Sequence, residues 1–266
     1  MKIPFSKYQG AGNDFVIVDD RNQNFPVSNN LIKKLCDRHF GIGADGLMLL
    51  SNSTKYDFLM RYFNSDGNES TMCGNGGRCI THFANKIGLI ETSTVFEGID
   101  GAHHASIVKK NYIRLKMKDI DSIEMMDDNY FIDSGSPHYI NFVRDVDSVD
   151  VNREGKLIRQ SVNINNGGTN VNFIQVISND ILKIRTFERG VEAETLACGT
   201  GAVASSIAYS LYFETESKSI KLIAPGGELF VSFKKENSSS FKDVWLEGPA
   251  HHVYNGEIDT SSLLSE

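Results

Sequence analysis

The sequence predicts an α/β protein of the α+β type, in which two halves repeat a similar order of elements. The first observation is a motif that occurs twice, as ESTMCGNG at 69–76 and as ETLACGTG at 194–201. A run compatible with a helix follows each copy, GRCITHFANKIG in the first half and AVASSIAYSLYF in the second. The second observation is that short strands separated by turn residues surround both runs. With 266 residues, the chain is long enough for sizeable cores in one or two domains.

The first half begins with two strands and a helix. Residues 3–20 contain a strand, a glycine-rich turn and the β-branched strand FVIVD. Ser28 precedes LIKKLCDRHF at 31–40, where apolar residues fall on one helical face, so a capped helix is expected there. The helix after Cys73 is expected to end near Gly88. Turn residues delimit further predicted strands within 41–50, 56–64, 92–98, 103–110 and 112–118, the last three in an antiparallel sheet.

The second half is expected to repeat this order. A short helix is predicted at 151–162, and strands are predicted within 131–143, 169–177, 182–190, 220–235 and 243–258. TNVNFIQVI at 169–177 echoes GNDFVIV at 12–18, and LKIRTFERG at 182–190 echoes FLMRYFNSDG at 58–67. The boundary between the halves is expected within the acidic stretch 118–128, and the last residues, 260–266, are expected to be frayed.

Composition and charge exclude several classes of protein. The formal net charge of −7 and the pI near 5.5 argue against a general nucleic-acid binder, which usually presents a basic face. The N-terminal ten residues, MKIPFSKYQG, contain no apolar export segment, and no uncharged run approaches the length of a membrane span. Four cysteines in a chain of this length do not resemble a secreted disulfide framework. We therefore expect a cytoplasmic protein with free thiols.

The repeated Cys-Gly-polar-Gly motif suits chemistry at the start of a helix. The first amides of a helix have no intrahelical partner, and the peptide dipoles leave partial positive charge there. A cysteine at such a position has its thiolate stabilised, so its pKa falls from about 8.5 toward neutrality. Glycine lets a ligand approach the free amides, which bind carboxylates or phosphates. Two such elements predict a ligand held between two helix ends, with one thiol on each side.

Structural explanations compete at several of these positions. Cys36 lies on the apolar face of its helix and Cys79 follows Cys73 on the same helix, so both are expected to pack in the core. A zinc site is disfavoured because the sequence has no CxxC and His103-His104 lack matching ligands. The loops also lack both GxGxxG after a strand and GxxxxGK[ST], which disfavours a nucleotide site. From the residues alone, loop or surface roles remain open for His138, Arg189 and Asn13.

A set of motifs in a fixed order along nearly the whole chain resembles the diaminopimelate epimerase family. They are GAGNDF at 10–15, GIGADG at 41–46, FNSDG at 63–67, CGNGGR at 73–78, Ser136-Pro137-His138, Glu188-Arg189-Gly190 and ACGTG at 197–201. Each motif alone is weak, but CGNG and ACGTG together with GNDF and ERG form a specific combination.

The resemblance implies two pseudo-symmetric domains, each a mostly antiparallel sheet curled around a central helix, with the active site in the cleft between them. The first domain would comprise 1–118 and about 250–266 and would carry Cys73, and the second would comprise 119–249 and carry Cys198. The implied reaction interconverts LL- and meso-2,6-diaminopimelate in lysine and peptidoglycan precursor biosynthesis. It would use no pyridoxal phosphate, other cofactor or metal, and the family also implies a homodimer.

The resemblance also assigns roles to individual residues. Cys73 and Cys198 match the two catalytic cysteines, and His138 and Glu188 match groups that tune them. Residues matching substrate-binding positions are Asn13, Asn64, Gly74, Asn75, Asn170, Glu188, Arg189, Gly199 and Thr200. This sequence departs from the usual pattern at Ser136, at Gly46 and in a longer spacing between Arg189 and Cys198, so recognition of the distal half of the substrate is less defined.

These residue types fit the implied chemistry. Inverting an α-carbon requires removing a proton from one face and delivering one to the other, which a thiolate and a thiol can do without moving. The amides at the helix ends would stabilise the carbanion-like transition state, while Arg189 would clamp a distal carboxylate and Glu188 an ammonium. Two alternatives remain: a two-cysteine racemase for proline or hydroxyproline, and a thiol redox switch or binding protein that closes a Cys73–Cys198 disulfide.

Overall fold

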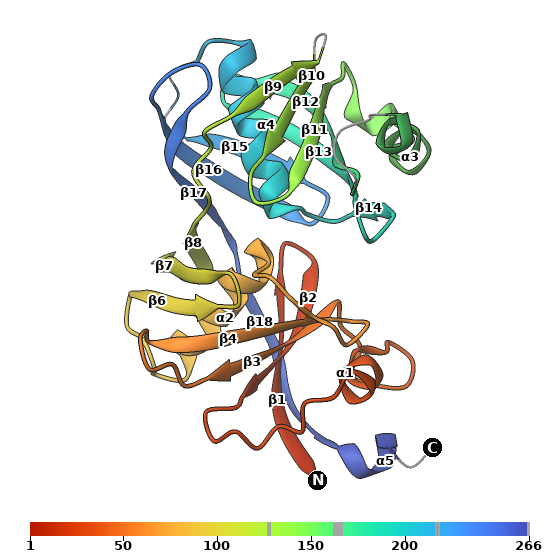
Figure 1. Cartoon of the computed structure of the whole chain (residues 1–266), viewed down its shortest axis with the longest axis vertical. Helices are drawn as coiled ribbons and strands as arrows, with labels where there is room; N and C mark the ends of the chain where they lie inside the picture. Colours follow the sequence, from red (N-terminus) through yellow and green to blue (C-terminus); the bar gives the residue numbers. More distant parts are fainter. Residues whose placement is uncertain (127–128, 162–166, 216, 218, 265–266) are drawn as a thin grey trace. The chain divides into compact units, whose positions relative to one another are not determined.

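The computed structural model describes residues 1–126, 129–161, 167–215, 217 and 219–264 of the chain (Figure 1). These residues form two compact units. Unit 1 comprises Met1–Leu115 and Pro249–Glu266, and unit 2 comprises Lys116–Gly248. In the part of the chain that is described, no helix combines the length and apolar character needed to cross a membrane.

Unit 1 contains most of the first half of the chain and its last strand. Its elements are β1 (Lys2–Gly10), β2 (Asn13–Asp19), α1 (Asn29–Cys36), β3 (Gly46–Ser51), β4 (Phe58–Asn64), β5 (Glu69–Ser70), α2 (Gly74–Lys86), β6 (Ser93–Gly98), β7 (Gly101–Lys109), β8 (Tyr112–Lys116), β18 (His251–Asp259) and α5 (Thr260–Leu264). The strands pair in the order β18, β1, β2, β3, β4, β6, β7, β8, with β5 added beside β4. Only β2–β3 and β4–β6 are parallel pairs among them.

Unit 2 has the same plan. Its elements are β9 (Ile123–Met126), β10 (Asn129–Asp133), β11 (Pro137–Phe142), η1 (Val146–Ser148), α3 (Val151–Ser161), β12 (Asn170–Ser178), β13 (Ile181–Glu188), β14 (Ala193–Thr195), α4 (Gly199–Tyr212), β15 (Ile220–Ala224), β16 (Gly227–Lys235) and β17 (Phe241–Pro249). The strands pair in the order β9, β10, β11, β12, β13, β15, β16, β17, with β14 beside β13. The parallel pairs, β11–β12 and β13–β15, occupy the same places as those of unit 1.

The two units are therefore pseudo-symmetric, as predicted, and the repeat runs from β1 to β9 and from β10 to β18. The last strand of each repeat joins the first strand of the other. Strand β9 pairs with β10, and β18 pairs with β1, both antiparallel. The chain consequently crosses twice between the units, near residue 115 and near residue 249.

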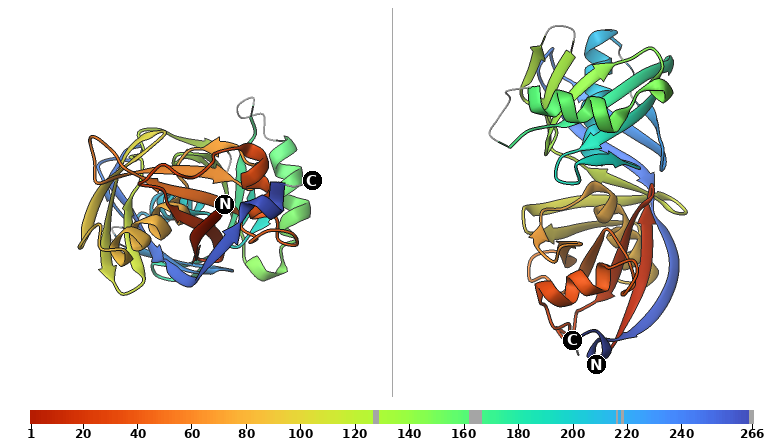
Figure 2. Two further views of the ribbon diagram at one scale, coloured as in Figure 1. Left: turned by 90° about the horizontal axis from the view of Figure 1, so that it is seen from below. Right: turned by 90° about the vertical axis from the view of Figure 1, so that its right-hand side faces the viewer.

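A buried helix occupies the centre of each unit. Helix α2 packs against β1, β2, β3, β7 and β18 (Figures 1 and 2). Helix α4 packs against β10, β11, β12 and β16, which are the counterparts of the first four of these strands, and against β15. The sequence of α4, GTGAVASSIAYSLY, is apolar or small on every side, which is the pattern of a helix enclosed on all faces. The outer helix α1 differs, because only Leu31, Ile32, Leu35 and Cys36 face the core.

Most predicted elements are confirmed, with three corrections or limits. The segment 169–177 is not the counterpart of 12–18: it forms β12, which corresponds to β3, whereas β2 corresponds to β11. The C-terminal segment is not frayed throughout, because Thr260–Leu264 forms α5 and the backbone amide of Thr260 donates to the carbonyl of Met1 at 2.8 Å. This bond holds the two ends of the chain together in unit 1 (Figure 2). Residues 127–128, 162 and 265–266, which the predictions also covered, lie outside the described residues.

Candidate active site

Both motif cysteines stand at the N-cap of a central helix, as the repeated motif predicts. Cys73 precedes α2 and Cys198 precedes α4, each with extended backbone angles. Their carbonyls accept the first helical hydrogen bonds, from Gly77 at 2.7 Å and from Ala202 at 2.9 Å. The amides of the first helical turn, beginning at Gly74 and Gly199, have no partner within the helix, so each end can hold an anion.

In unit 1, Cys73 lies beside two asparagine side chains. The thiol of Cys73 donates to Oδ1 of Asn13, with 3.6 Å between the sulfur and the oxygen. The amide nitrogen of Asn75 donates to the same oxygen at 3.3 Å. Asn13 is the first residue of β2 and Asn75 is the second residue of α2, so the central helix and its neighbouring strand build this half of the site together.

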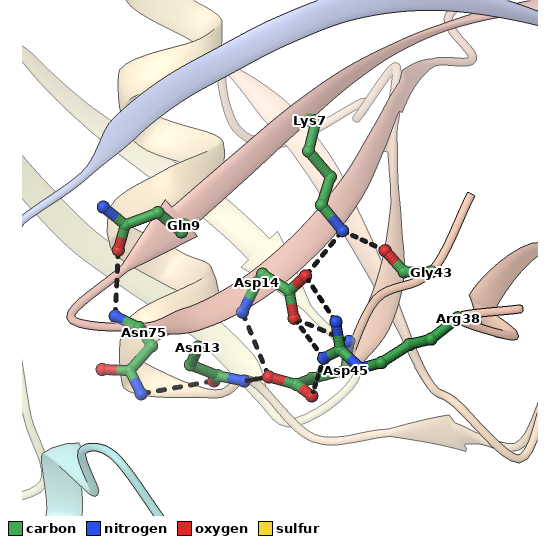
Figure 3. Close-up of polar contacts among 9 residues, drawn as sticks. Lys7, Gln9, Asn13, Asp14, Arg38, Gly43, Asp45 and Asn75 are labelled. Atoms are coloured by element: carbon green, nitrogen blue, oxygen red, sulfur yellow. Dashed lines mark hydrogen bonds and ion pairs between the residues drawn. The ribbon is translucent and has the colours of Figure 1, made fainter. Parts of the chain in front are cut away.

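Behind Asn13 lies a network of charged side chains (Figure 3). Nδ2 of Asn13 donates to Oδ2 of Asp45 at 2.7 Å. The Nη2 atom of Arg38 lies 2.7 Å from carboxylate oxygens of both Asp14 and Asp45, and Nζ of Lys7 lies 2.6 Å from Asp14. Lys7 also donates to the carbonyl of Gly43.

Two cations thus neutralise two carboxylates in this network. Burial raises the pKa of Asp14, but hydrogen bonds from Arg38 and Lys7 outweigh it and bring the pKa to about 2. Asp14 therefore stays ionised at neutral pH. The backbone amide of Asp14 also donates to Oδ2 of Asp45 at 3.1 Å, which fixes this carboxylate against the start of β2.

A second charged residue holds Asn75. Arg78 is fully buried, and its Nη2 donates to Oδ1 of Asn75 at 2.8 Å. Its other donors reach the carbonyls of Gly74 and Pro249 at 3.2 and 3.3 Å. Burial lowers the pKa of Arg78, while its interactions with Cys79 and Cys73 raise it. Arg78 therefore places positive charge near the Cys73 end of α2.

In unit 2, Cys198 lies beside Thr200 and His138. The sulfur of Cys198 is 3.5 Å from Oγ1 of Thr200, and Nε2 of His138 is 2.8 Å from the same oxygen. The hydroxyl of Ser134 donates to the carbonyl of Thr200 at 2.8 Å. His138 is the second residue of β11, the counterpart of β2, so both half-sites take a polar group from the same strand of the repeat.

Hydrogen-bond directions around His138 follow from its neighbours. The amide nitrogen of Asn172 lies 3.4 Å from the carbonyl of Tyr139, which can only accept, and 2.9 Å from Nδ1 of His138. Burial lowers the pKa of His138 to about 3, so the ring is neutral and its Nδ1 accepts. The ring proton is then on Nε2 and is donated to Thr200. The hydroxyl of Thr200 keeps its own proton, which it can donate to the sulfur of Cys198.

The glycine after Thr200 is required by close packing. A Cβ on Gly201 would lie 2.5 Å from Oδ1 of Asn172. This oxygen also accepts a hydrogen bond from the hydroxyl of Thr186 at 2.9 Å. The glycine lets α4 approach β12, so that Asn172 can hold His138. Gly76, the counterpart in α2, faces the flexible side chain of Met48 instead.

The predicted distal-substrate residues of unit 2 form one cluster. The amide nitrogen of Asn170 donates to the hydroxyl of Ser136 and to the carbonyl of Pro137, both at 2.9 Å. Its Oδ1 accepts from the backbone amide of Arg189 at 2.9 Å. Oε2 of Glu188 accepts from the hydroxyl of Thr195 at 2.9 Å. Asn170 is buried and bound to protein groups, so in this structure it positions the Glu188–Arg189 turn.

The remaining predicted residue of unit 1, Asn64, is exposed at the end of β4. Its backbone amide donates to the carbonyl of Asn68 at 3.0 Å, in the turn that follows β4. Gly46 pairs with Asn64 across β3 and β4. A Cβ at Gly46 would lie 2.6 Å from both the carbonyl of Phe63 and a ring carbon of Tyr62, so the glycine at this departure from the family pattern matches tight packing between the paired strands β3 and β4.

The other two cysteines have structural surroundings. Cys36 packs in the core of unit 1 with Leu31 and Leu35, and Cys79 is fully buried. Burial raises the pKa of each of these thiols to about 12. Both stay protonated at neutral pH, which agrees with the packing roles expected from the sequence.

Sequence reasoning did not assign a role to several residues that shape these half-sites. Asp45 and Arg78 lie inside the motifs GIGADG and CGNGGR. Asp45 is brought near its partner Asn13 only by folding, whereas Arg78 lies three residues after its partner Asn75 on the same helix. Asn172 shares a strand face with Asn170, two residues earlier, and this spacing was a usable signal. Asp14 likewise lies inside the motif GAGNDF. The other members, for which the sequence offered no signal, are Lys7, Arg38, Ser134 and Thr186.

Comparisons with known proteins agree on one family. The model of the family described as diaminopimelate epimerase matches residues 5–119 and 130–253. A diaminopimelate epimerase from Flavobacterium psychrophilum is 49% identical over 95% of this chain and 98% of the relative, and one from Chlorobaculum tepidum is 42% identical over 94% and 98%. The fold is similar to a solved PhzF-family phenazine biosynthesis protein of Bacillus anthracis, with a TM-score of 0.74, 17% identity and coverage of 97% and 99%.

Proposed function

The chain belongs to the diaminopimelate epimerase family, and we propose that it interconverts LL- and meso-2,6-diaminopimelate. This activity would place it in the synthesis of lysine and of peptidoglycan precursors. The observation that carries the proposal is the family match over both halves of the chain, each of which contains a cysteine at the start of a buried central helix.

The proposed chemistry is a two-base proton transfer that needs no added cofactor. One cysteine, as a thiolate, takes the α-proton from one face of the carbon, and the other, as a thiol, donates a proton to the opposite face. For the reverse reaction the two sulfurs exchange roles. Because Cys73 and Cys198 occupy the same position in a pseudo-symmetric repeat, they supply chemically similar groups to the two faces.

The helix ends supply the electrostatic stabilisation that this reaction requires. The α-proton of an amino acid is very weakly acidic, so negative charge develops on the α-carboxylate as the proton leaves. Amides of the first turns of α2 and α4, beginning at Gly74 and Gly199, are suited to bind this carboxylate. Asn75 and Thr200, the next residue of each helix, would border the same group.

Hydrogen-bond direction supports unequal protonation of the two cysteines. The neutral ring of His138 donates to Thr200, whose hydroxyl can then donate to Cys198. Cys73 instead donates to the amide oxygen of Asn13. In the substrate-free protein, Cys198 therefore favours the thiolate and Cys73 the thiol, which is the pair that a two-base reaction needs.

The distal half of the substrate is assigned to the remaining predicted residues. The guanidinium of Arg189 would bind the distal carboxylate, and Glu188 would bind the distal ammonium. Asn13 and Asn64 would add contacts from unit 1. Asn170 supports this group by holding the backbone amide of Arg189. A site that fixes the distal charges also determines which stereocentre reaches the sulfurs.

The assembly and location are proposed from the family alone. We propose a homodimer in the cytoplasm, where thiols remain reduced. Reduction matters because a bond between the two sulfurs would remove both the acid and the base.

Deuterium exchange tests the proposed reaction. The reduced protein is incubated with LL-diaminopimelate in D₂O, and α-deuterium uptake and meso product are followed. We expect both in the wild type and neither in Cys73→Ala or Cys198→Ala, with losses on the order of a thousandfold or more. Exchange that persists in the double variant would reject the two-thiol mechanism.

The same assay separates the rival functions. Exchange with proline or hydroxyproline, but not with diaminopimelate, would identify a racemase of another substrate class. Absence of exchange with all three, together with ligand-dependent formation of a Cys73–Cys198 disulfide, would identify a redox or binding protein. The charged pair Glu188–Arg189 favours the longer substrate with charges at its far end.

A further inference from the structure

We propose that Asp45 is a positioning residue, which turns the side-chain amide of Asn13 so that its oxygen faces Cys73 and keeps this cysteine in the thiol form before substrate binds. The inference gives Asp45 a place in the proposed reaction and rests on the proposed role of Cys73. Figure 3 shows Asp45 on one side of Asn13 and Asn75 on the other.

The direction of the Asn13 amide is fixed from the side of Asp45. A carboxylate can only accept hydrogen bonds, so the atom of Asn13 that lies 2.7 Å from Oδ2 of Asp45 is the nitrogen. The carboxylate itself cannot turn freely, because Arg38 and the backbone amide of Asp14 both donate to it. The amide oxygen of Asn13 is consequently directed at the other neighbours, Cys73 and Asn75.

The direction is fixed independently from the side of Arg78. A guanidinium can only donate, so the atom of Asn75 that lies 2.8 Å from Nη2 of Arg78 is the oxygen. The amide nitrogen of Asn75 therefore faces Asn13, at 3.3 Å from its Oδ1. A fully buried cation and an anchored carboxylate thus hold the two amides between them in a single orientation.

This orientation determines what Cys73 can do. An amide oxygen stabilises a thiol that donates to it and repels a thiolate. The positive charges that reach this region act in the opposite direction: Arg78 favours a thiolate at Cys73, as does the dipole of α2. Cys79 is neutral, with its pKa raised by burial to about 12. Within the charged network, Lys7 and Arg38 offset Asp14 and Asp45.

The contrast with unit 2 makes the inference specific. There, the neighbour of Cys198 is the hydroxyl of Thr200, a neutral group that can donate to the sulfur and that accepts from His138, which Asn172 holds in turn. In unit 2 the side chain that orients the group next to the cysteine is thus an amide, Asn172 on β12. In unit 1 it is a carboxylate, Asp45, which directly precedes β3. This difference breaks the symmetry of the repeat and gives the two sulfurs opposite hydrogen-bonding roles.

The test measures the pH dependence of alkylation at each sulfur. The reduced full-length protein reacts with iodoacetamide over a range of pH, and the rate at each cysteine is read by mass spectrometry. Asp45→Asn lets the Asn13 amide reverse and present its nitrogen to the sulfur. We expect the midpoint at Cys73 to fall by about one pH unit, whereas that of Cys198, the internal control, stays in place.

A double-mutant cycle separates orientation from charge, since Asp45→Asn also removes a negative charge. The substitution is repeated in the Asn13→Ala background, where no amide can turn. We expect the Asp45→Asn shift to shrink to a third or less there. A shift of equal size in both backgrounds, or an unchanged Cys73 midpoint in Asp45→Asn, would overturn the inference.

Two further variants guard against trivial outcomes. Asp121→Asn makes the same chemical change at an exposed carboxylate of unit 2 and should leave both midpoints unchanged. If Asp45→Asn does not fold, Asn13→Ala alone decides: removal of the accepting oxygen should lower the Cys73 midpoint, and an unchanged or raised midpoint contradicts the inference. Alkylation measures the reactivity of each cysteine sulfur directly. Its result is therefore independent of whether deuterium exchange confirms the proposed reaction.

Discussion

The imidazole Nε2 of His138 lies 2.8 Å from the hydroxyl oxygen of Thr200, and the same oxygen lies 3.5 Å from the sulfur of Cys198. His138 is fully buried and neutral, so it does not act as a charged partner of the cysteine. Its Nε2–H instead donates to the hydroxyl oxygen of Thr200, so the hydroxyl proton is available to the sulfur of Cys198. His138 can therefore act on the sulfur of Cys198 through the hydroxyl of Thr200.

Replacement of Thr200 should test this link. Thr200→Val keeps the shape of the side chain but removes the hydroxyl, so we expect a loss of about ten- to a hundredfold in deuterium exchange and slower alkylation of Cys198 at neutral pH. Thr200→Ser keeps the hydroxyl and should retain most of the activity. Equal activity of the valine and serine variants would show that the hydroxyl has no part in the reaction.

Acid should destabilise the protein through His138. Burial lowers the pKa of this histidine to about 3, below the value near 6.5 of an unfolded chain. The stabilisation from the neutral ring is therefore complete above about pH 6.5 and is lost as pH falls toward 3. Between pH 6.5 and pH 5 the loss should be on the order of 2 kcal/mol.

Thermal unfolding at pH 7.5 and pH 5 measures this effect. The wild type should show a larger drop in melting temperature than His138→Gln, which has no group that titrates. Replacement of the exposed His39 by Gln serves as the matched control and should leave the drop unchanged. Parallel drops in the wild type and His138→Gln would assign the acid sensitivity to other groups.

The two equivalent glycines of the motifs should differ in their tolerance of alanine. A Cβ at Gly201 would approach Oδ1 of Asn172 to 2.5 Å, so Gly201→Ala must displace the group that holds His138. A Cβ at Gly76 would meet the sulfur of Met48 at 3.2 Å, and this side chain can move. We expect Gly201→Ala to lower the free energy of unfolding by about 1–3 kcal/mol more than Gly76→Ala, as measured in urea. Equal costs would contradict this difference in packing.

Alkylation should distinguish the four cysteines. Burial raises the pKa of Cys36 and of Cys79 to about 12, whereas Cys73 and Cys198 are only half-buried. At pH 8, brief treatment of the folded protein with iodoacetamide should label Cys73 and Cys198 alone, with the other two reacting after denaturation. Labelling of Cys36 in the folded state at a comparable rate would show that the core around α1 opens readily.

Much of the fold was predictable because short sequence motifs mark the equivalent helices and strands of the two repeats. The two Cys-Gly-polar-Gly motifs mark the starts of α2 and α4, and LKIRTFERG and FLMRYFNSDG are true counterparts in β13 and β4. The match of TNVNFIQVI to GNDFVIV was wrong because an asparagine before an apolar strand is a feature of composition. The counterpart of a segment is decided by strand pairing, and the pairing of β12 with β11 makes β12 the counterpart of β3.

The site was predictable only in part, for a related reason. Cysteines at helix starts can be read locally, but the orientation of an amide depends on donors and acceptors from distant segments. Asn13, for example, is held by Asp45 of the loop before β3. Asn75 is an exception, because Arg78 lies three residues later on its own helix. The C-terminal helix was missed because its anchor, the carbonyl of Met1, lies at the opposite end of the sequence.

The exchange of last strands, β9 to β10 and β18 to β1, bears on how such a polypeptide could have arisen from a single ancestral copy. A single-repeat protein that ended after β9 would have no partner for β9 within its own sheet. The outer edge of its β1 would also be unpaired. Two such proteins could form a dimer in which the last strand of each pairs with the first strand of the other. Fusion of the two genes would then give the present connectivity. Because β9 and β10 are then joined in one chain, the association of the two repeats no longer depends on protein concentration.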